Sequence, residues 1–188
     1  MSTDEALRNT VTIPLVKGAT LKAADRTITA KGPLGTVVRP FPTEAIDFAV
    51  TKEGIVLTLK IPPNRKKAKA LLHTWERHVA NLVGGVTHGF EAKMKVVAAH
   101  FPMKVQVKDQ ALLIENFLGE KYPRTAPLTH GVKASVEGDI VTLTGFDVEL
   151  VGQSAANIER ATKIRDYDPR VFQDGIYIIE RARLKEGS

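Results

Sequence analysis

The chain has 188 residues, of which 43% are hydrophobic and 26% charged, so it has enough apolar material for one medium domain or two small ones. It contains no cysteine, which excludes disulfides, thiolate metal sites and cysteine nucleophiles and is typical of a reducing cytoplasm. It also has no apolar stretch near the roughly 20 residues of a membrane span, so we expect no membrane partner. The net charge of +6 makes a nucleic-acid partner a fair first hypothesis, although many basic proteins bind no polyanion.

In the first half, short runs of β-branched and aliphatic residues predict strands at residues 27–30 and 54–59. Pro62-Pro63 should stop the second strand, and Asn64 is placed to cap a helix. We expect Gly84-Gly85 to end that helix. Its apolar residues recur at helical spacing: Ala68, Leu71, Leu72, Trp75, Val79, Leu82 and Val83.

The second half repeats this pattern of strands followed by a helix. Strands are predicted at residues 93–97, 105–107, 112–115, 133–136 and 140–144, the last two joined as a hairpin by the Glu137-Gly138-Asp139 turn. Asp147 can cap a helix whose apolar rhythm runs through about Ile164. A last strand is predicted at residues 175–180.

The similarity of the two halves can be seen by shifting the chain along itself by 84 residues without a gap. The shift aligns identical residues: Asp25 with Asp109, Leu34 with Leu118, Gly35 with Gly119, Glu53 with Glu137, Gly54 with Gly138, Thr58 with Thr142 and Leu59 with Leu143. Two of these pairs are glycines at turn-like positions, where the backbone dictates the residue. A period this long indicates two folded halves rather than a solenoid.

The predicted fold is therefore α+β, with two tandem similar domains from an internal duplication. Each domain is a small, mostly antiparallel sheet covered by one helix. The boundary should lie near Gly84 to Gly89, which gives an N-terminal repeat over residues 1–86 and a C-terminal repeat with a basic tail over residues 87–188.

Histidine offers no clear metal site in this sequence. His73 and His78 share the first predicted helix, but a spacing of five residues places them about 140° apart around it, whereas two ligands on one face need a spacing of three or four. His88, His100 and His130 lie in turn-like settings that are typical of hydrogen-bonding surface residues. We expect no metal and no other cofactor.

Catalytic patterns are also missing. The sequence has no phosphate-binding glycine loop and no nucleophile elbow around its serines. Asp166, Asp168 and Asp174 lie around Arg165 and Arg170, and we interpret this grouping as an ionic loop rather than as a paired acid and base. We expect neither an enzyme nor a small-molecule substrate.

The excess positive charge lies in the first half. Residues 1–86 carry 13 basic and 7 acidic side chains, whereas residues 87–188 carry 14 of each. One cluster falls in the first turns of the predicted helix, at Arg65, Lys66, Lys67 and Lys69. Cations are disfavoured there by the helix dipole, so the cluster indicates a phosphate contact, with a solvated charged face as the alternative.

A second set of cations is spread over the loops and tail of the second half. If the last strand runs beside the earlier ones, these residues should converge on one edge of the second domain. They are Lys121, Arg124, Arg160, Lys163, Arg165, Arg170, Arg181, Arg183 and Lys185.

Four stretches together resemble the large-subunit ribosomal protein L6 family in its archaeal and eukaryotic branch, of which the eukaryotic members are called L-nine. They are Gly85-Val86-Thr87-His88-Gly89-Phe90, Ala99-His100-Phe101-Pro102-Met103, Asn116-Phe117-Leu118-Gly119-Glu120-Lys121 and Arg170-Val171-Phe172-Gln173-Asp174-Gly175-Ile176-Tyr177. The resemblance covers essentially the whole chain. The chain departs from the family pattern at Arg160 and Tyr167, where the family has a glutamine and a basic residue.

The resemblance implies a structural protein of the large subunit in the cytoplasmic ribosome. Its partners would be large-subunit ribosomal RNA near the sarcin-ricin loop, contacted chiefly through the second domain, and neighbouring ribosomal proteins at the stalk base, where it would support the factor-binding region. The second set of cations would then be the RNA-binding residues. The Arg65 to Lys69 cluster would make a secondary RNA or protein contact.

Two other functions stay open at this point. The first is a free-standing tandem-domain module for protein interaction, in which the basic loops are incidental. The second is a small hydrolase, which would need a pocket with converging titratable groups.

Overall fold

The computed structural model of the protein describes residues 10–14, 16, 18–24, 27–41, 44–51, 54–60, 66–168 and 170–185, without the side chains of residues 66 and 68. The chain divides into two compact units between His88 and Gly89. The expected helix cap at Asn64 and the strand stop at Pro62-Pro63 lie outside the described residues.

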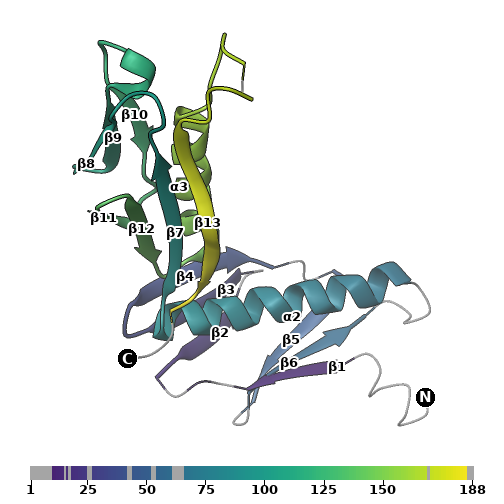
Figure 1. The fold of residues 1–188 in the computed structure, drawn as a ribbon. Coiled ribbons are helices and arrows are strands. Elements are labelled where there is room, and N and C mark those ends of the chain that lie inside the picture. The colour runs from purple at the N-terminus through teal and green to yellow at the C-terminus, as the bar shows by residue number, and fades with distance from the viewer. Residues whose placement is uncertain are drawn as a thin grey trace. The chain divides into compact units, whose positions relative to one another are not determined.

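The described part of the first unit consists of strands followed by one long helix (Figure 1). In chain order they are β1 (Thr10–Pro14), β2 (Thr20–Ala24), β3 (Thr27–Gly32), β4 (Gly35–Pro40), β5 (Ile46–Val50), β6 (Gly54–Leu59) and α2 (Lys66–Thr87). The strands form two three-stranded sheets, in the orders β1-β6-β5 and β2-β3-β4. The helix packs on both sheets, through contacts with β1, β3, β4 and β6.

The second unit follows the same order and adds a strand at its end. Its elements are β7 (Phe90–Val97), β8 (Lys104–Lys108), β9 (Ala111–Glu115), the short 3-10 helix η1 (Phe117–Gly119), β10 (Arg124–Pro127), β11 (Lys133–Glu137), β12 (Ile140–Gly145), α3 (Val148–Ala161) and β13 (Gly175–Leu184). Its sheets have the orders β11-β12-β7-β13 and β10-β9-β8.

The two topologies confirm the predicted α+β duplication. In each unit the last strand before the helix pairs antiparallel with the first strand of the unit and with the strand that precedes it in the chain. In the first unit β6 pairs with β1 and β5, and in the second unit β12 pairs with β7 and β11. The three intervening strands form the second sheet in each unit. Each unit thus has two sheets where the sequence predicted one. Strand β13 has no counterpart among the described strands of the first unit.

Both cores are built from the alternating residues of central strands and one face of the helix. In the second unit Met94, Leu143, Ile158 and Ile176 are fully buried, and Phe117 anchors η1 in the same core. In the first unit Val79 and Val86 of α2 are fully buried, as are strand residues of the sheets it covers. Each such side chain stabilises its unit by about 1.5–3 kcal/mol through burial.

The prediction that Gly84-Gly85 ends the first helix is wrong. Helix α2 continues to Thr87, because its last turn is packed in the core: Val86 is fully buried and its carbonyl accepts a hydrogen bond from Leu34 N at 3.1 Å. Gly32 permits this approach, since a Cβ there would lie 2.5 Å from the Val86 carbonyl oxygen. The boundary between the units therefore follows the helix end, two residues after the predicted position.

The second helix is shorter than predicted, ending at Ala161 rather than near Ile164. Its N-terminus is as expected, because the Asp147 side chain accepts a hydrogen bond from Glu149 N at 2.9 Å. At the other end, the Thr162 hydroxyl oxygen accepts a hydrogen bond from Ile176 N at 3.1 Å and fixes the helix end to β13. Thr162 is buried and Ile164 packs against the core, although both lie beyond the end of the helix.

Candidate nucleic-acid interface

Three loops meet at one end of the second unit: residues 98–103 after β7, residues 116–123 around η1, and residues 162–174 between α3 and β13 (Figure 1). Three of the four family-like stretches lie in these loops or begin there. The loops are joined by hydrogen bonds, among them one from Asn116 Nδ2 to the Pro102 carbonyl at 3.0 Å. We call this region the loop end of the second unit.

A buried carboxylate joins the first and third of these loops. Asp174, with a side chain 1% exposed, accepts a hydrogen bond from His100 N at 2.9 Å, and its other oxygen lies 2.6 Å from His100 Nδ1. Burial raises the pKa of Asp174, but the hydrogen bonds from the His100 backbone and ring, its charge and the Ala99 N–H outweigh it and leave the pKa lowered. The prediction that Asp174 belongs to an ionic loop with the arginines is therefore wrong.

Aromatic rings pack beside this contact. The ring of Phe172 lies between those of His100 and Tyr167, with centroid distances of 4.5 and 4.7 Å. Asp168 accepts a hydrogen bond from Arg170 N, so it caps a backbone turn and its carboxylate contacts the Arg170 backbone rather than the guanidinium. The third loop is thus held by local backbone contacts and by ring packing.

The loop around η1 contains several residues with positive φ. Asn116, Leu118 and Gly119 have left-handed φ values of 59°, 51° and 79°. Glycine and asparagine tolerate this conformation, whereas it costs Leu118 about 1–2 kcal/mol. The cost is offset by packing, because Phe117 is 1% exposed and the Phe101 ring lies close to Gly119. The backbone of this loop is therefore fixed by its neighbours.

Arg124, the first residue of β10, links this loop to the end of α3. Its Nε and Nη2 donate to the two carboxylate oxygens of Glu120 at 2.8 and 2.6 Å, and its Nη1 donates to the carbonyls of Ala161 and Lys163 at 2.9 and 3.1 Å. The guanidinium also lies over the Phe117 ring, 4.2 Å from its centroid. The hydrogen bond from Arg124 lowers the pKa of Glu120.

Four predicted cations surround one cleft beside this linkage, of about 350 Å³. It is lined by Arg124, Thr125, Arg160, Ala161, Lys163 and Arg165. The side chains of Arg160, Lys163 and Arg165 are exposed, and within the described residues they form no ion pair or hydrogen bond. No carboxylate lines the cleft.

The other predicted cations of the second unit lie elsewhere. Lys121 and Arg170 are exposed on the η1 loop and on the third loop. The remaining three, Arg181, Arg183 and Lys185, lie toward or just beyond the C-terminal end of β13. There Lys185 N donates a hydrogen bond to the Gly89 carbonyl, and Arg183 pairs in register with Glu91. At about 3.3 Å per residue the strand separates its two ends by roughly 30 Å, so the predicted convergence of all nine cations is wrong.

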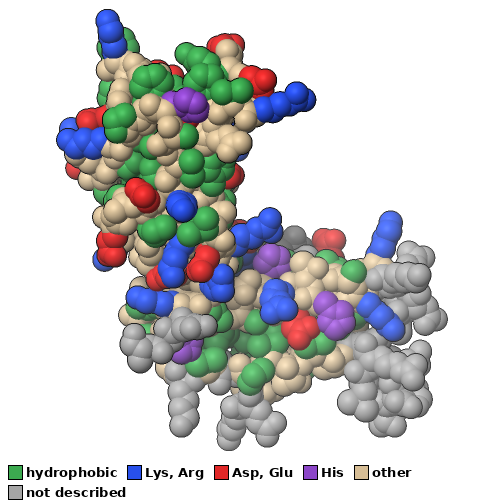
Figure 2. Space-filling view, in the orientation of Figure 1, with side chains coloured by type: hydrophobic (Ala, Val, Ile, Leu, Met, Phe, Trp, Pro, Cys, Tyr) green, Lys and Arg blue, Asp and Glu red, His purple; other side chains and the backbone are tan. Residues whose placement is uncertain are grey.

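Acids lie among the cations at the far end of β13. A shallow depression of about 300 Å³ there is lined by Glu91, Lys93, Glu180, Arg183, Leu184 and Lys185. Glu180 lies 3.6 Å from Lys93 and 3.7 Å from Arg183. Figure 2 likewise shows that, on the face it presents, Lys and Arg side chains are interspersed with Asp and Glu. The acid-free cleft beside α3 is the exception.

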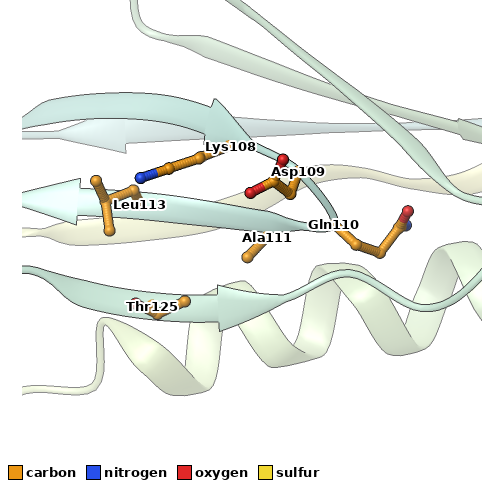
Figure 3. A pocket seen from close by; sticks show the side chains of 6 residues that line it. All are labelled: Lys108, Asp109, Gln110, Ala111, Leu113 and Thr125. Carbon is orange, nitrogen blue, oxygen red and sulfur yellow. The ribbon is translucent and has the colours of Figure 1, made fainter.

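A further depression of about 370 Å³ lies on the outer face of the β10-β9-β8 sheet (Figure 3). It is lined by Lys108, Asp109, Gln110, Ala111, Leu113 and Thr125, and so shares Thr125 with the cation-lined cleft. Its floor is mostly apolar, and its single cation is adjacent in sequence to Asp109. It is a weaker candidate for an anion site.

In the first unit, the predicted basic cluster falls in the first turn of α2. Lys67 and Lys69 are exposed there, and the first turn of α2 contains no acidic residue. Arg65 lies outside the described residues, and the Lys66 side chain is not described.

Three of the five histidines, all of which the structure describes, have side-chain partners: His100, which contacts Asp174, and the two histidines of α2. His73 Nδ1 lies 2.9 Å from Glu76 Oε2, and His78 Nδ1 lies 3.5 Å from Arg39 Nη1. Across the part of the chain that the structure describes, no group of three His, Asp or Glu residues could hold a metal ion. No helix in the same part is long and apolar enough to cross a membrane.

Sequence reasoning missed the two contacts that fix the loop end, His100 with Asp174 and Glu120 with Arg124. The first joins residues 74 positions apart, which no local pattern can reveal. The second carried a signal, since an acid and an arginine four residues apart often pair, although here they do so across a loop rather than along a helix.

Comparison with known proteins identifies relatives along nearly the whole chain. The family model described as ribosomal protein L6 matches twice, over residues 16–89 and 101–175. The chain is 46% identical to the large ribosomal subunit protein uL6 of Methanobrevibacter smithii, over 94% of this chain and 97% of the relative. It is 45% identical to the uL6 protein of Methanosarcina mazei, over 91% and 96% of the two chains.

The double match agrees with the duplication seen in the two topologies, and the relatives confirm the resemblance carried by the four motifs. The chain therefore belongs to the ribosomal protein L6 family, a family of structural proteins of the cytoplasmic ribosome and not of enzymes.

Proposed function

We propose that the protein is a structural component of the large ribosomal subunit and binds large-subunit ribosomal RNA through the loop end of its second unit. The observation that carries this proposal is the acid-free cleft beside α3, where three exposed cations have no protein partner within the described residues. Unpaired cations on a rigid frame are what phosphate recognition requires. The names of the uL6 relatives support the choice of subunit.

Within the subunit we propose a position near the sarcin-ricin loop, with neighbouring ribosomal proteins of the stalk base as further partners. This finer placement rests on the family resemblance. The total charge of residues 87–188 is zero, but a binding face is set by the local potential, and no carboxylate is among the residues that line the cleft. Lys67 and Lys69 of the first unit would make a secondary RNA or protein contact.

Chemical footprinting on large-subunit ribosomal RNA, with and without the full-length protein, tests both the partner and its position. We expect protection near the sarcin-ricin loop and the stalk base. We also expect binding to weaken steeply with salt, with a slope of log K against log salt of about −0.7 to −0.9 for each neutralised phosphate. Binding that does not depend on salt, or protection confined to another part of the RNA, would contradict the proposal.

A matched pair of variants tests the polarity of the second unit. Arg165→Glu at the cleft should reduce RNA binding strongly. Arg183→Glu should have a small effect, because Arg183 lies among carboxylates at the other end of β13. An equal effect of both variants would mean that the loop end is not the main contact.

A further inference from the structure

The cleft beside α3 lies at the C-terminal end of a helix, where an anion would ordinarily be repelled. The last four carbonyls of a helix have no partner within it and carry the negative end of the helix dipole. A phosphate can bind next to them only if these carbonyls are satisfied by other groups. The hydrogen-bond partners of these four carbonyls therefore decide whether the three exposed cations around the cleft can bind one phosphate together.

All four of these carbonyls in α3 accept hydrogen bonds. The Thr162 N–H donates to the Ile158 carbonyl at 3.2 Å, and its hydroxyl contacts the Glu159 carbonyl at 3.3 Å. The Lys163 N–H donates to the Arg160 carbonyl at 3.3 Å. Arg124 Nη1 donates to the last one, at Ala161, and also to the Lys163 carbonyl just beyond the helix.

Arg124 itself has little capacity left for an anion. A guanidinium has five N–H donors, and four of those of Arg124 are directed at Glu120 and at the two carbonyls. Its charge is paired with that of Glu120, and its side chain is 24% exposed. By contrast, Arg160, Lys163 and Arg165 are exposed, and their side chains have no partner among the described residues.

We propose that the cleft binds one phosphate group of the RNA backbone, that Arg160, Lys163 and Arg165 are its ligands, and that Arg124 is a positioning residue. Arg124 donates hydrogen bonds to the carbonyls of Ala161 and Lys163, which would otherwise repel the phosphate. It also holds the segment that carries the three cations against the η1 loop. This inference rests on the proposed RNA-binding function. It divides the predicted cations into phosphate ligands, one positioning residue, and cations that do not contact this phosphate.

The test measures the affinity of the full-length protein for deproteinised archaeal large-subunit ribosomal RNA over a series of KCl concentrations. The cleft variant is Arg160→Gln with Lys163→Gln and Arg165→Gln. Its matched control is Arg181→Gln with Arg183→Gln and Lys185→Gln, which makes the same change in net charge at the other end of β13. Thermal unfolding is measured to check that both variants are folded.

For the cleft variant we expect Kd to rise about tenfold or more and the salt slope to fall by about 1, because one phosphate is no longer neutralised. The control should change Kd less than about threefold and leave the slope unchanged. A fall of nearly 3 in the salt slope would mean that the three side chains neutralise three separate phosphates, and it would overturn the single-phosphate site. Equal losses in the two variants, or no loss in the cleft variant, would overturn the site altogether.

Arg124→Lys separates positioning from direct contact, because it keeps the charge and loses the forked hydrogen bonds. If Arg124 positions the site, this variant should weaken binding and lower the salt slope by about 1, as the cleft variant does. If Arg124 were a ligand, lysine would keep the slope, and a purely structural role would lower the unfolding temperature with the slope unchanged. If the wild-type protein showed no salt-dependent binding, the proposed function would fail, whereas failure of the variants alone would overturn only this inference.

Discussion

The two units share one topology but differ in what is attached to it. In both, a strand pairs with the last strand before the covering helix, and three intervening strands form a second sheet. Within the part of the chain that the structure describes, β13 has no counterpart in the first unit, and the loops at one end of the second unit are joined by the His100–Asp174 and Glu120–Arg124 pairs. The candidate interface therefore combines the two kinds of part, because Arg124 and Arg160 belong to repeated elements, whereas Lys163 and Arg165 lie in the loop that leads to β13.

Equivalent residues in the repeat can also be retained for different physical reasons, as Gly54 and Gly138 show. At Gly54 a Cβ would lie 2.2 Å from the Ile13 carbonyl oxygen, so the glycine permits β1 to approach β6. At Gly138 no atom lies within 4 Å of the Cβ position, and φ is +60° in the β11–β12 turn. One glycine is required by close packing and the other by the turn.

The largest effect is therefore expected from Gly54→Ala, which should destabilise the first unit by about 3 kcal/mol, because a backbone carbonyl has to move. Gly138→Ala should cost about 1 kcal/mol in the second unit. Gly138→Asn should recover much of that loss, since asparagine tolerates this conformation, while Gly54→Asn should be as harmful as alanine. Hydrogen exchange resolved by residue assigns each loss to its unit, and rescue of both sites by asparagine would refute the distinction.

The next largest effect is expected at Asp174, the only buried carboxylate among the described residues of the chain. Asp174→Ala should destabilise the second unit by about 2–3 kcal/mol, since it leaves the backbone N–H of His100 without its acceptor and the His100 ring without its ion pair. Asp166→Asn, an exposed position in the same loop whose left-handed φ of 64° asparagine tolerates, is the control and should change stability little. The measurement is denaturant unfolding, and equal losses in the two variants would contradict a structural role for the pair.

The parts of the fold that the sequence predicts are those with strong periodicity. Central strands such as β6, β9 and β12 bury alternate residues, and both helices show a clear apolar face. The five strands missed by the sequence analysis, β1, β2, β4, β5 and β10, are all edge strands that bury a single residue each, so the alternation hardly appears in them. Their pairing is decided by the tertiary structure.

The candidate site was predicted in composition but not in arrangement. The cations of the loops were recognisable, and four of them do line one cleft. Their division between the two ends of β13 depends on the length of that strand, which extends four residues beyond the predicted Glu180. The different role of Arg124 depends on contacts with Glu120 and with carbonyls almost 40 residues away, which no spacing rule contains.

A smaller effect should distinguish how the two covering helices end. The Thr162 hydroxyl contacts carbonyls of α3 and also accepts a hydrogen bond from Ile176 N of β13, whereas the Thr87 hydroxyl donates only to carbonyls within α2. Thr162→Val should therefore cost about 1–2 kcal/mol, because the buried Ile176 N–H loses its acceptor, and Thr87→Val should cost a few tenths. Thermal unfolding of the two variants gives the comparison, and a cost at Thr87 as large as that at Thr162 would show that the link to β13 is unimportant.

The smallest effect is the response to acid, which should fall on the second unit. Asp174 and Glu120 have pKa values lowered below their ordinary values of 3.8 and 4.5, so the stability that they contribute is present above those values and is lost as the pH falls through the lower folded pKa values. We expect protection from hydrogen exchange at the loop end to decrease below about pH 4. The double variant Asp174→Asn with Glu120→Gln should be less stable at pH 7 but lose little more on acidification. An unchanged acid response in that variant would assign the effect to other carboxylates.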